Sequence, residues 1–378
     1  MLEKIKLGSL IKVHSGESIE VSSLLKYGDY PVYGGNGING YCKNYNIPKD
    51  TMIIGRVGEK CGNVNITFKK SWISDNALIV VPLKKHNIKY LEYLLKHINL
   101  NNYANKNAQP VISGKIINDI DIEYNSNLKE QKSIADTLTN IDNLIDSLQK
   151  IIEKKEKIFK AATQELLNGK NRVYDWKKVR IGDIGEFTGN GVDKKIRKDE
   201  QKIRILNYMD IMHYNFIYSN ISNYFATASN EKINKCSVKK GDIFLTPSSE
   251  TRLDIGVSSV AMEDIDDLVY SYHIVRFRPI IEMDLLFRAY IFKNQKFLNQ
   301  ASTMCEGSGK RYVCSNKKFA SFELEIPIDI REQKDIANKL YAMEKEVNML
   351  KNKLLKYKQI KEGMMEDLLT GKVRLDYE

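Results

Sequence analysis

The sequence predicts an α/β (α+β) protein with two globular domains joined by two long antiparallel coiled-coil helices, arranged as a tandem pseudo-twofold repeat. Three observations predict this fold. The chain aligns with itself at a constant offset, each copy ends in a long heptad-like apolar pattern, and the remaining segments carry β-type runs punctuated by glycine and asparagine. With 378 residues and 42% hydrophobic content, the chain can bury more than one core.

The internal repeat is clearest in the two long apolar patterns. Gln131 matches Gln333 and Leu166 matches Leu368, all at an offset of 202. Near the two starts, KLGSLIKVHSG resembles RIGDIGEFTGN at an offset of 174, so the second copy carries about 28 additional residues. A period near 200 is too long for a solenoid, so each copy should be a domain plus a helix.

Residues 1–130 are predicted to form the first globular domain. Three of its runs, rich in aromatic and β-branched residues, indicate strands and tight turns: YPVYGGNGINGY, TMIIGRVGEKCGNVNITF and SWISDNALIVVPL. The later run LEYLLKHINL predicts a short helix.

Residues 131–170 and 333–378 are predicted to contain the central and C-terminal spacer helices. Their apolar positions step alternately by four and three residues, which is typical of a coiled-coil seam. Each helix is about 38 residues, or roughly 57 Å, and Gly169 and Gly371 should end the helices in left-handed conformations. The seam residues are Ile134, Leu138, Ile141, Ile145, Leu148 and Ile152 in the first copy and Ile336, Leu340, Met343, Val347, Leu350 and Leu354 in the second.

Helices of this length cannot bury their seams within one small domain, so we expect the two helices to pack against each other. Separate helical contacts with another subunit are the competing interpretation. Residues 171–332 are predicted to form the second globular domain, with GDIFLTPSSET, DIGVSSVAM and YSYHIVRFRP as strands or loops and MDLLFRAYIFKNQKFLNQ as its helix.

Composition narrows the class of protein. The net charge of +11 favours a polyanionic partner, although an AT-rich genome would also enrich lysine, and no segment forms a basic arm. Five scattered cysteines without a CxxC indicate reduced thiols and no zinc ribbon. The first residues lack a signal-peptide core and no apolar run reaches about 18 residues, so we expect a cytoplasmic protein without membrane spans.

Several short motifs resemble catalytic or cofactor sites but lack the context that such sites need. GNGING is followed by YCKNYNIPKD rather than by an apolar helix, which argues against a dinucleotide site. FTGNG resembles an S-adenosylmethionine loop, but no two prolines are adjacent, as the base-gripping loop of a DNA amino-methyltransferase would need. The five histidines show no metal-ligand spacing. We expect no catalytic residues, no metal and no cofactor.

The remaining candidates are polar loops on strand scaffolds, whose side chains suit contacts with phosphates and base edges. Taken singly, each residue is better explained as a solvated or turn-capping side chain, but together they suggest a binding surface in each copy. The candidates are Tyr33, Asn36, Arg56, Lys60, Ser74 and Asn76 in the first copy and Lys194, Lys195, Arg197, Ser248, Ser249, Arg252, Ser308, Lys310 and Arg311 in the second.

Several spaced motifs now point to a known family. The chain resembles, over essentially its whole length, the specificity (S) subunit of type I restriction-modification systems through YPVYGGNGINGY, IIGRVGEKCGNV, SDNAL, GDIFLTPSSET with DIGVSS, and the two EQKxIA helices ending in LLNGK and LLTGK. One departure is NKNAQPVIS at 105–113, which lacks the GSG found at 307–309.

The resemblance implies a DNA-recognition role. In such subunits each target-recognition domain reads one half of a bipartite, asymmetric site in double-stranded DNA, and the helices hold the halves at a fixed spacing. The subunit recruits two adenine methyltransferase (M) subunits and the restriction (R) subunits. We therefore expect a non-catalytic specificity subunit. A coiled-coil scaffold that binds only proteins is the main alternative, and a catalytic enzyme is disfavoured by the missing motifs.

Overall fold

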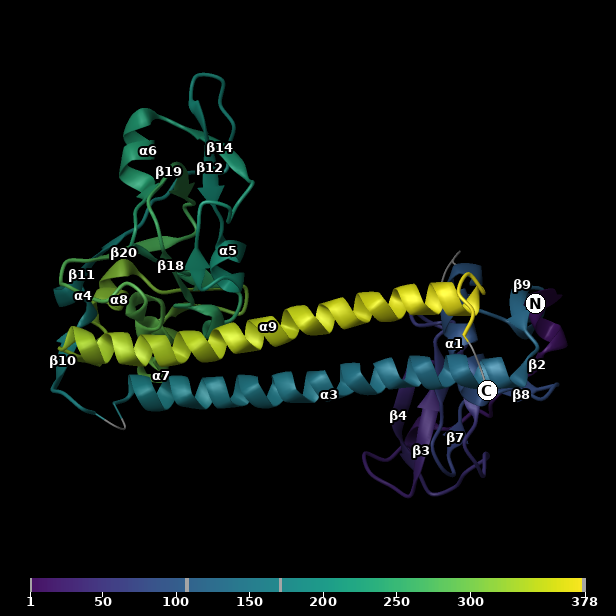
Figure 1. The fold of residues 1–378 in the computed structure, drawn as a ribbon. Coiled ribbons are helices and arrows are strands. Elements are labelled where there is room, and N and C mark those ends of the chain that lie inside the picture. The colour runs from purple at the N-terminus through teal and green to yellow at the C-terminus, as the bar shows by residue number, and fades with distance from the viewer. Residues whose placement is uncertain (1, 106–108, 170–171, 376–378) are drawn as a thin grey trace. The chain divides into compact units, whose positions relative to one another are not determined.

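The computed structural model describes residues 2–105, 109–169 and 172–375, and its chain forms two compact units. Unit 1 comprises Met1–Lys150 with Lys351–Glu378, and unit 2 comprises Ile151–Leu350. Two 40-residue helices, α3 (Leu128–Leu167) and α9 (Ile330–Leu369), each contribute one part to each unit (Figure 1). Because these units cut through both helices, the four-segment division expected from the sequence stays a prediction.

The globular part of unit 1 consists of small sheets and two short helices. A two-stranded antiparallel sheet pairs β1 with β9, a four-stranded sheet has the order β2-β8-β5-β6, and a three-stranded sheet has the order β4-β3-β7. The strands are β1 (Leu2–Lys6), β2 (Ile11–Ser15), β3 (Tyr30–Gly34), β4 (Gly37–Cys42), β5 (Met52–Gly55), β6 (Val64–Ile66), β7 (Trp72–Ile73), β8 (Ala77–Pro82) and β9 (Asp121–Asn125), and the helices are α1 (Ile88–Ile98) and α2 (Gly114–Asn118).

The core of unit 1 joins its globule to both long helices. Leu91 and Leu95 of α1 lie in one buried cluster with Leu138 of α3 and with Leu368 and Leu369 of α9. Figure 1 shows α1 beside these helix segments. The strand runs and the short helix expected in the first domain are confirmed. The GNGING run forms the turn of the β3–β4 hairpin and the first residues of β4, not the start of a helix.

Unit 2 has a larger set of sheets. Their orders are β10-β23, β11-β20-β16-β18-β13, β14-β12-β19-β15 and β17-β22-β21. The strands are β10 (Trp176–Arg180), β11 (Gly185–Thr188), β12 (Gln201–Leu206), β13 (Phe216–Ile217), β14 (Phe225–Ala228), β15 (Ser237–Val238), β16 (Ile243–Leu245), β17 (Ser248–Ser249), β18 (Ser258–Ala261), β19 (Ile265–Tyr270), β20 (Val275–Pro279), β21 (Glu306–Ser308), β22 (Arg311–Val313) and β23 (Glu323–Pro327).

The short helices of unit 2 are α4 (Ile181–Ile184), α5 (Tyr208–His213), α6 (Asn230–Cys236), α7 (Gln295–Met304) and α8 (Asn316–Ser321). The single helix expected over 283–300 is wrong. Two 3-10 turns, η5 (Phe287–Ala289) and η6 (Ile291–Lys293), precede α7. The side chain of Asn294 accepts a hydrogen bond from the Lys296 amide, and this N-cap starts a new helix at Gln295.

Each unit contains a pair formed by its first and last strands, followed by a long helix, and we call this arrangement the frame. The frame recurs in both units at the offsets seen in the sequence. Strands β1 and β10 start 174 residues apart, whereas β9 and β23, like α3 and α9, start 202 residues apart. Gln131 is fully buried, donates to the Asn125 carbonyl at 2.7 Å and accepts from the Asn87 amide at 2.8 Å. Gln333 donates to the Pro327 carbonyl and accepts from the Asp284 amide in the same way. One glutamine thus ties the last strand of each globule to its long helix.

The long helices run antiparallel within unit 1. Lys361 Nζ of α9 lies 2.6 Å from Asp142 of α3, and Arg374, beyond the end of α9, pairs with Glu130 near the start of α3. In unit 2, Lys155 pairs with Glu346 at 2.8 Å. Of the expected seam, Ile134, Leu138, Ile145, Leu148, Ile152, Ile336, Leu340 and Val347 are buried, and Ile141, Met343, Leu350 and Leu354 are partly buried.

The helix ends agree with the sequence pattern. Gly169 and Gly371 have φ of 65° and 69°, so the left-handed C-terminal glycines are confirmed. Lys170, which follows the first of them, lies outside the described residues. Within the described ranges, no helix has the length and apolar character needed to cross a membrane.

Candidate functional site

Three loops of unit 1 converge at the β3–β4 turn. The Arg56 amide, just after β5, donates to the Asn76 carbonyl at 2.9 Å, and the Ser74 amide donates to the Tyr33 carbonyl at 2.9 Å. A Cβ on Gly35 would lie only 3.0 Å from the Asn76 carbonyl oxygen. Glycine is therefore needed where the turn approaches this loop, and the structure brings the predicted segments together.

The six predicted residues of unit 1 differ in accessibility. Asn36, Lys60 and Asn76 are exposed, whereas Tyr33 and Ser74 are only 6% and 4% exposed and belong to the layer beneath the loops. Arg56 is partly buried, and its Nη1 donates to Ser15 Oγ at 3.0 Å and to the Asp75 carbonyl at 3.3 Å.

A fourth loop, part of the NKNAQPVIS run that lacks the GSG of the second copy, packs beside the other three. The Gly58 amide donates to the Pro110 carbonyl, and the Ile112 amide donates to the Arg56 carbonyl, both at 2.9 Å. Residues 106–108 of that run lie outside the described residues.

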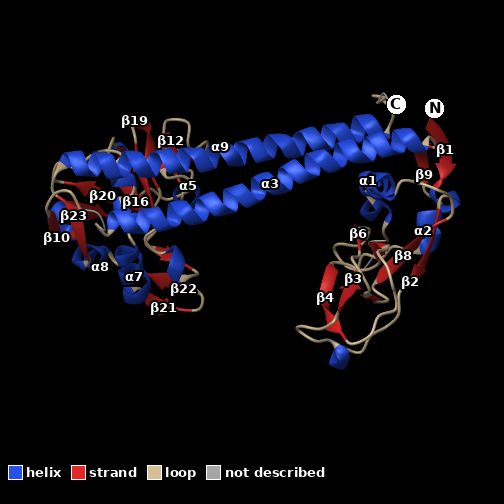
Figure 2. Ribbon diagram, turned by 60° about the horizontal axis from the view of Figure 1, so that its bottom comes forward, coloured by secondary structure: helices blue, strands red, loops and turns tan. Residues whose placement is uncertain are grey.

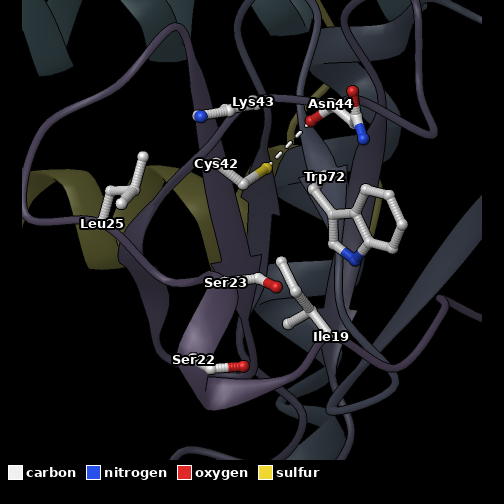
Figure 3. A pocket seen from close by; sticks show the side chains of 8 residues that line it. All are labelled: Ile19, Ser22, Ser23, Leu25, Cys42, Lys43, Asn44 and Trp72. Carbon is white, nitrogen blue, oxygen red and sulfur yellow. Dashed lines mark hydrogen bonds between the residues drawn. The ribbon is translucent and has the colours of Figure 1, made fainter.

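A separate cavity of about 410 Å³ lies in unit 1 beside η2 (Val21–Ser23), β4 and β7. Figure 3 shows Trp72 facing Ile19, with the Cys42 thiol donating to the Asn44 carbonyl. The indole Nε1 of Trp72 donates to the Glu17 carbonyl at 3.1 Å. The cavity lining contains none of the six predicted residues of unit 1.

In unit 2 the predicted serine and arginine loops meet in one sheet. Strand β17 carries Ser248 and Ser249 and pairs with β22, which starts at Arg311 and pairs with β21 (Figure 2). Arg311 Nη2 donates to Ser248 Oγ at 3.1 Å. Ser308, Lys310 and Arg311 are exposed at the turn of this hairpin.

This sheet forms one side of a cavity of about 590 Å³ lined by Ser248, Ser249, Lys310 and Arg311. Sequence reasoning missed Tyr208, Met209 and Met212 of α5 and His273, because each lies at least 24 positions from any of these four residues along the chain. The cavity is completed by Glu250, Thr251 and Asp254 of the loop that directly follows Ser249.

The surroundings of the cavity shift the pKa of His273. Burial lowers the pKa of the His273 imidazole below its usual value, and the positive charges of Lys194 and Arg311 lower it further, while Asp193 opposes them. His273 therefore stays largely neutral near pH 7 in the free protein. The cationic groups that act on it come from two predicted segments, the 194–197 run and the hairpin.

The other predicted basic residues have partners on the protein. Lys195 pairs with Asp193 at 3.4 Å and Arg197 with Glu200 at 3.0 Å, although both side chains are exposed. Exposed pairs of this kind are weak and can be exchanged for phosphate.

Arg252 has a different environment from the one expected of a base-reading side chain. Its guanidinium donates to the Ser302 carbonyl at 3.1 Å and to the Cys305 carbonyl at 3.3 Å, and it lies 4.5 Å from the ring centroid of Tyr312. These contacts fix its loop against α7 and β22. Arg311 is the better candidate for contacting a ligand.

In the described part of the chain, no three His, Cys, Asp or Glu side chains lie together as a metal ion would need. The candidate surfaces present amides, hydroxyls and cationic side chains, and the cavity of unit 2 is also lined by Met209, Met212, two carboxylates and His273. Such groups bind and discriminate polyanions by hydrogen bonding and charge.

Comparison with known families gives a direct result. A family model described as "Type I restriction modification DNA specificity domain" matches the chain twice, over residues 2–157 and 174–359. The double match confirms the tandem repeat.

Curated relatives point the same way. The specificity subunit of the type I restriction enzyme EcoprrI from Escherichia coli is 29% identical over 161 residues, which is 42% of this chain and 40% of that protein. The MjaVIII specificity subunit from Methanocaldococcus jannaschii is 26% identical over 344 residues, covering 86% of this chain and 76% of that protein. The match thus spans less than half of the first relative and about three quarters of the second.

Solved structures share the fold. The crystal structure of the S subunit of a type I restriction-modification system from M. genitalium matches with a TM-score of 0.62 at 16% identity, covering 98% of this chain and 96% of that one. A chain from a structure on complex assembly and conformational transition of the type I R-M system matches with a TM-score of 0.59 at 11% identity, covering 98% of both chains. The expected fold class, two α/β globules with two long helices, is confirmed.

Proposed function

The chain belongs to the family of type I restriction-modification DNA specificity proteins, and on that premise we propose that it is the sequence-reading subunit of such a complex. Each globule reads one half of a bipartite, asymmetric site in double-stranded DNA. The specificity subunits among its relatives support a non-catalytic role.

One observation carries this proposal at the level of residues. The exposed hairpin turn of unit 2 presents Lys310 and Arg311 at a cavity that α5 also lines, and Arg311 keeps most of its guanidinium donors available after its bond to Ser248. A planar fork of donors beside hydroxyls suits the acceptor edge of a base, while lysine suits phosphate. The converging loops of unit 1, with Asn36, Lys60 and Asn76 exposed, supply the second reader.

The partners follow from the repeated frame. Because the two halves share one helix-and-glutamine arrangement, we infer that each half offers a similar surface to one of two identical adenine methyltransferase (M) subunits. Restriction (R) subunits join the same complex, and the long helices set the spacing of the half-sites. We propose that this assembly acts in the cytoplasm.

The experiment is a binding selection. Random duplexes are incubated with the chain, alone and with its methyltransferase subunits, and bound DNA is sequenced. We expect an enriched bipartite motif, with affinity that falls steeply with salt because phosphate contacts release counterions. Incubation of the chain alone with S-adenosylmethionine should give no methylated DNA.

Matched charge variants test the surface. Lys310→Ala with Arg311→Ala should weaken binding and relax one half of the motif, whereas Lys177→Ala with Lys178→Ala, which removes two exposed charges from β10 of the same unit, should change the selected motif little. The alternative function, a coiled-coil scaffold that binds only proteins, predicts that complexes form normally while no motif is enriched.

A further inference from the structure

The cavity of unit 2 has an apolar wall that charge-based DNA binding does not explain. Met209 and Met212 stand three residues apart on α5, hence on the same side of this helix, and both line the cavity. Met209 is 53% exposed, an unusual position for a large apolar side chain beside Lys310 and Arg311.

The wall is held in a fixed position. Helix α5 starts with a capping box in which the Asn207 amide donates to Asp210 at 2.8 Å, and Asp210 itself is buried. Ser259 Oγ donates to the Ile211 carbonyl at 3.2 Å from the neighbouring strand β18. The two methionines are therefore presented on a rigid support rather than on a loose loop.

Acidic residues that line the same cavity restrict which part of DNA can enter. Glu250 and Asp254 also line it, and Asp254 accepts hydrogen bonds from Ser249 Oγ at 3.0 Å and Thr251 Oγ1 at 2.9 Å. Carboxylates and thioethers repel or fail to bind a phosphate, whereas a base edge combines donors, acceptors and, in thymine, an apolar methyl group.

Resting on the proposed function, we propose that Met209 and Met212 are specificity-determining residues that contact the 5-methyl group of a thymine in the half-site read by unit 2. Arg311 and the Ser248–Ser249 hydroxyls face the polar edge of the same or the adjacent base pair. Methionine suits this role because its flexible, polarisable thioether packs against a small methyl group.

The test uses deoxyuridine, which differs from thymidine only by this methyl group. After the motif has been selected with the full complex, every thymine of both strands in the half-site sensitive to Arg311→Ala is replaced singly by deoxyuridine. At one position the dissociation constant should rise about fourfold, as expected for one buried methyl group.

Variants assign that effect to the methionines. Met209→Gln with Met212→Gln keeps side-chain length but removes the apolar wall, so the thymine-to-deoxyuridine ratio should fall to about one, whereas Met209→Leu with Met212→Leu should keep it near fourfold. Met349→Ala is the matched control, because Met349 is 61% exposed on α9 and does not line the cavity. That variant should keep the full ratio.

Each outcome decides the proposal. A thymine-to-deoxyuridine ratio of one at every thymine in the unaltered protein overturns it. A fourfold ratio that survives in the double glutamine variant also overturns it. Either result leaves packing against a sugar as the role of the wall. In both cases a selected motif would still support the proposed function. Failure to select any motif would overturn the function and the inference together.

Discussion

The two copies of the chain differ most in the segments that lie between their first and last strands. The frame next to the helices is kept, with β1–β9 and β10–β23 pairs and a buried glutamine in each unit. In the intervening part, the β4-β3-β7 sheet of unit 1 has a counterpart in β14-β12-β19 of unit 2, with the same antiparallel and parallel pairings. Unit 2 adds β15 to this sheet, adds β13 to its five-stranded sheet, and adds the β17-β22-β21 sheet. Backbone pairing constrains the frame, whereas loop residues change without disturbing it.

Even within the frame, individual side chains have exchanged partners. Arg374 pairs with the buried Glu130 in unit 1, and hydrogen bonding and charge from Arg374 hold the pKa of that carboxyl below its usual value despite its burial. At the repeat position, Arg172 pairs with Glu325, and Glu332 accepts from the Val173 amide. The frame thus preserves backbone geometry more strictly than ion pairing.

The largest expected effect tests whether the copies are interchangeable. A fragment ending at Tyr174 lacks the α9 part of unit 1, including the buried Leu368 and Leu369. Its own Leu166 and Leu167 occupy the matching repeat positions, so a second fragment can supply them. We expect a dimer by sedimentation equilibrium, which with methyltransferase subunits should read a palindrome of the first half-site.

A control variant makes this dimer test specific. Leu167→Asp places a charge where the partner fragment must bury an apolar side chain, so that fragment should remain a monomer. If the unaltered fragment is also monomeric at high concentration, the helices of the two copies are not interchangeable.

The second prediction compares the loss of stability when each of the two buried glutamines is replaced. Gln131 also donates to the Tyr124 hydroxyl at 2.8 Å, so it makes one bond more than the two seen at Gln333. Gln131→Ala should cost about 3 kcal/mol of unfolding free energy and Gln333→Ala about 2 kcal/mol, because buried partners are left unpaired.

The two tryptophans allow each unit to be followed separately. Trp72 lies in unit 1 and Trp176 in unit 2, so denaturant unfolding of each glutamine variant is read twice, through Trp72 in a Trp176→Phe background and through Trp176 in a Trp72→Phe background. Equal shifts of both signals for either variant would mean that the units unfold as one.

The sequence predicted the frame well and the site only in part. Offsets, helix ends and strand runs follow from local patterns, so the duplicated frame could be read directly. The wall formed by Met209 and Met212 could not, because α5 and the hairpin of Arg311 are about 100 residues apart in sequence and line one cavity only in the folded chain. From the sequence, its charge makes Arg252 a candidate for contacting DNA. In the structure its guanidinium lies over the ring of Tyr312 instead.

A third prediction compares one arginine from each reader. Arg311→Ala should weaken specific binding roughly 10- to 100-fold and relax the second half-site only, since a good bidentate base contact contributes about 1–3 kcal/mol. Arg56→Ala should have a smaller effect, confined to the first half-site, because Ser15 and the Asp75 carbonyl already hold its guanidinium. Sequencing of selected duplexes measures both, and equal loss on both halves would contradict modular reading.

The smallest effect concerns pH and belongs to unit 2 alone. Burial, followed by the charges of Lys194 and Arg311, lowers the pKa of His273, so the unfolded chain binds a proton there more readily and acidification below about pH 6.5 slightly destabilises the free fold. DNA phosphates near these cations oppose their effect and raise the pKa of His273 in the complex. Binding therefore takes up protons, and affinity should rise a few-fold as pH falls from about 7 to 6, with an upper limit of about tenfold per pH unit for one proton.

His273→Gln should flatten this dependence in filter-binding titrations, whereas His14→Gln in unit 1 should leave it unchanged. An unaltered slope in His273→Gln would place the titrating group elsewhere and remove this difference between the readers.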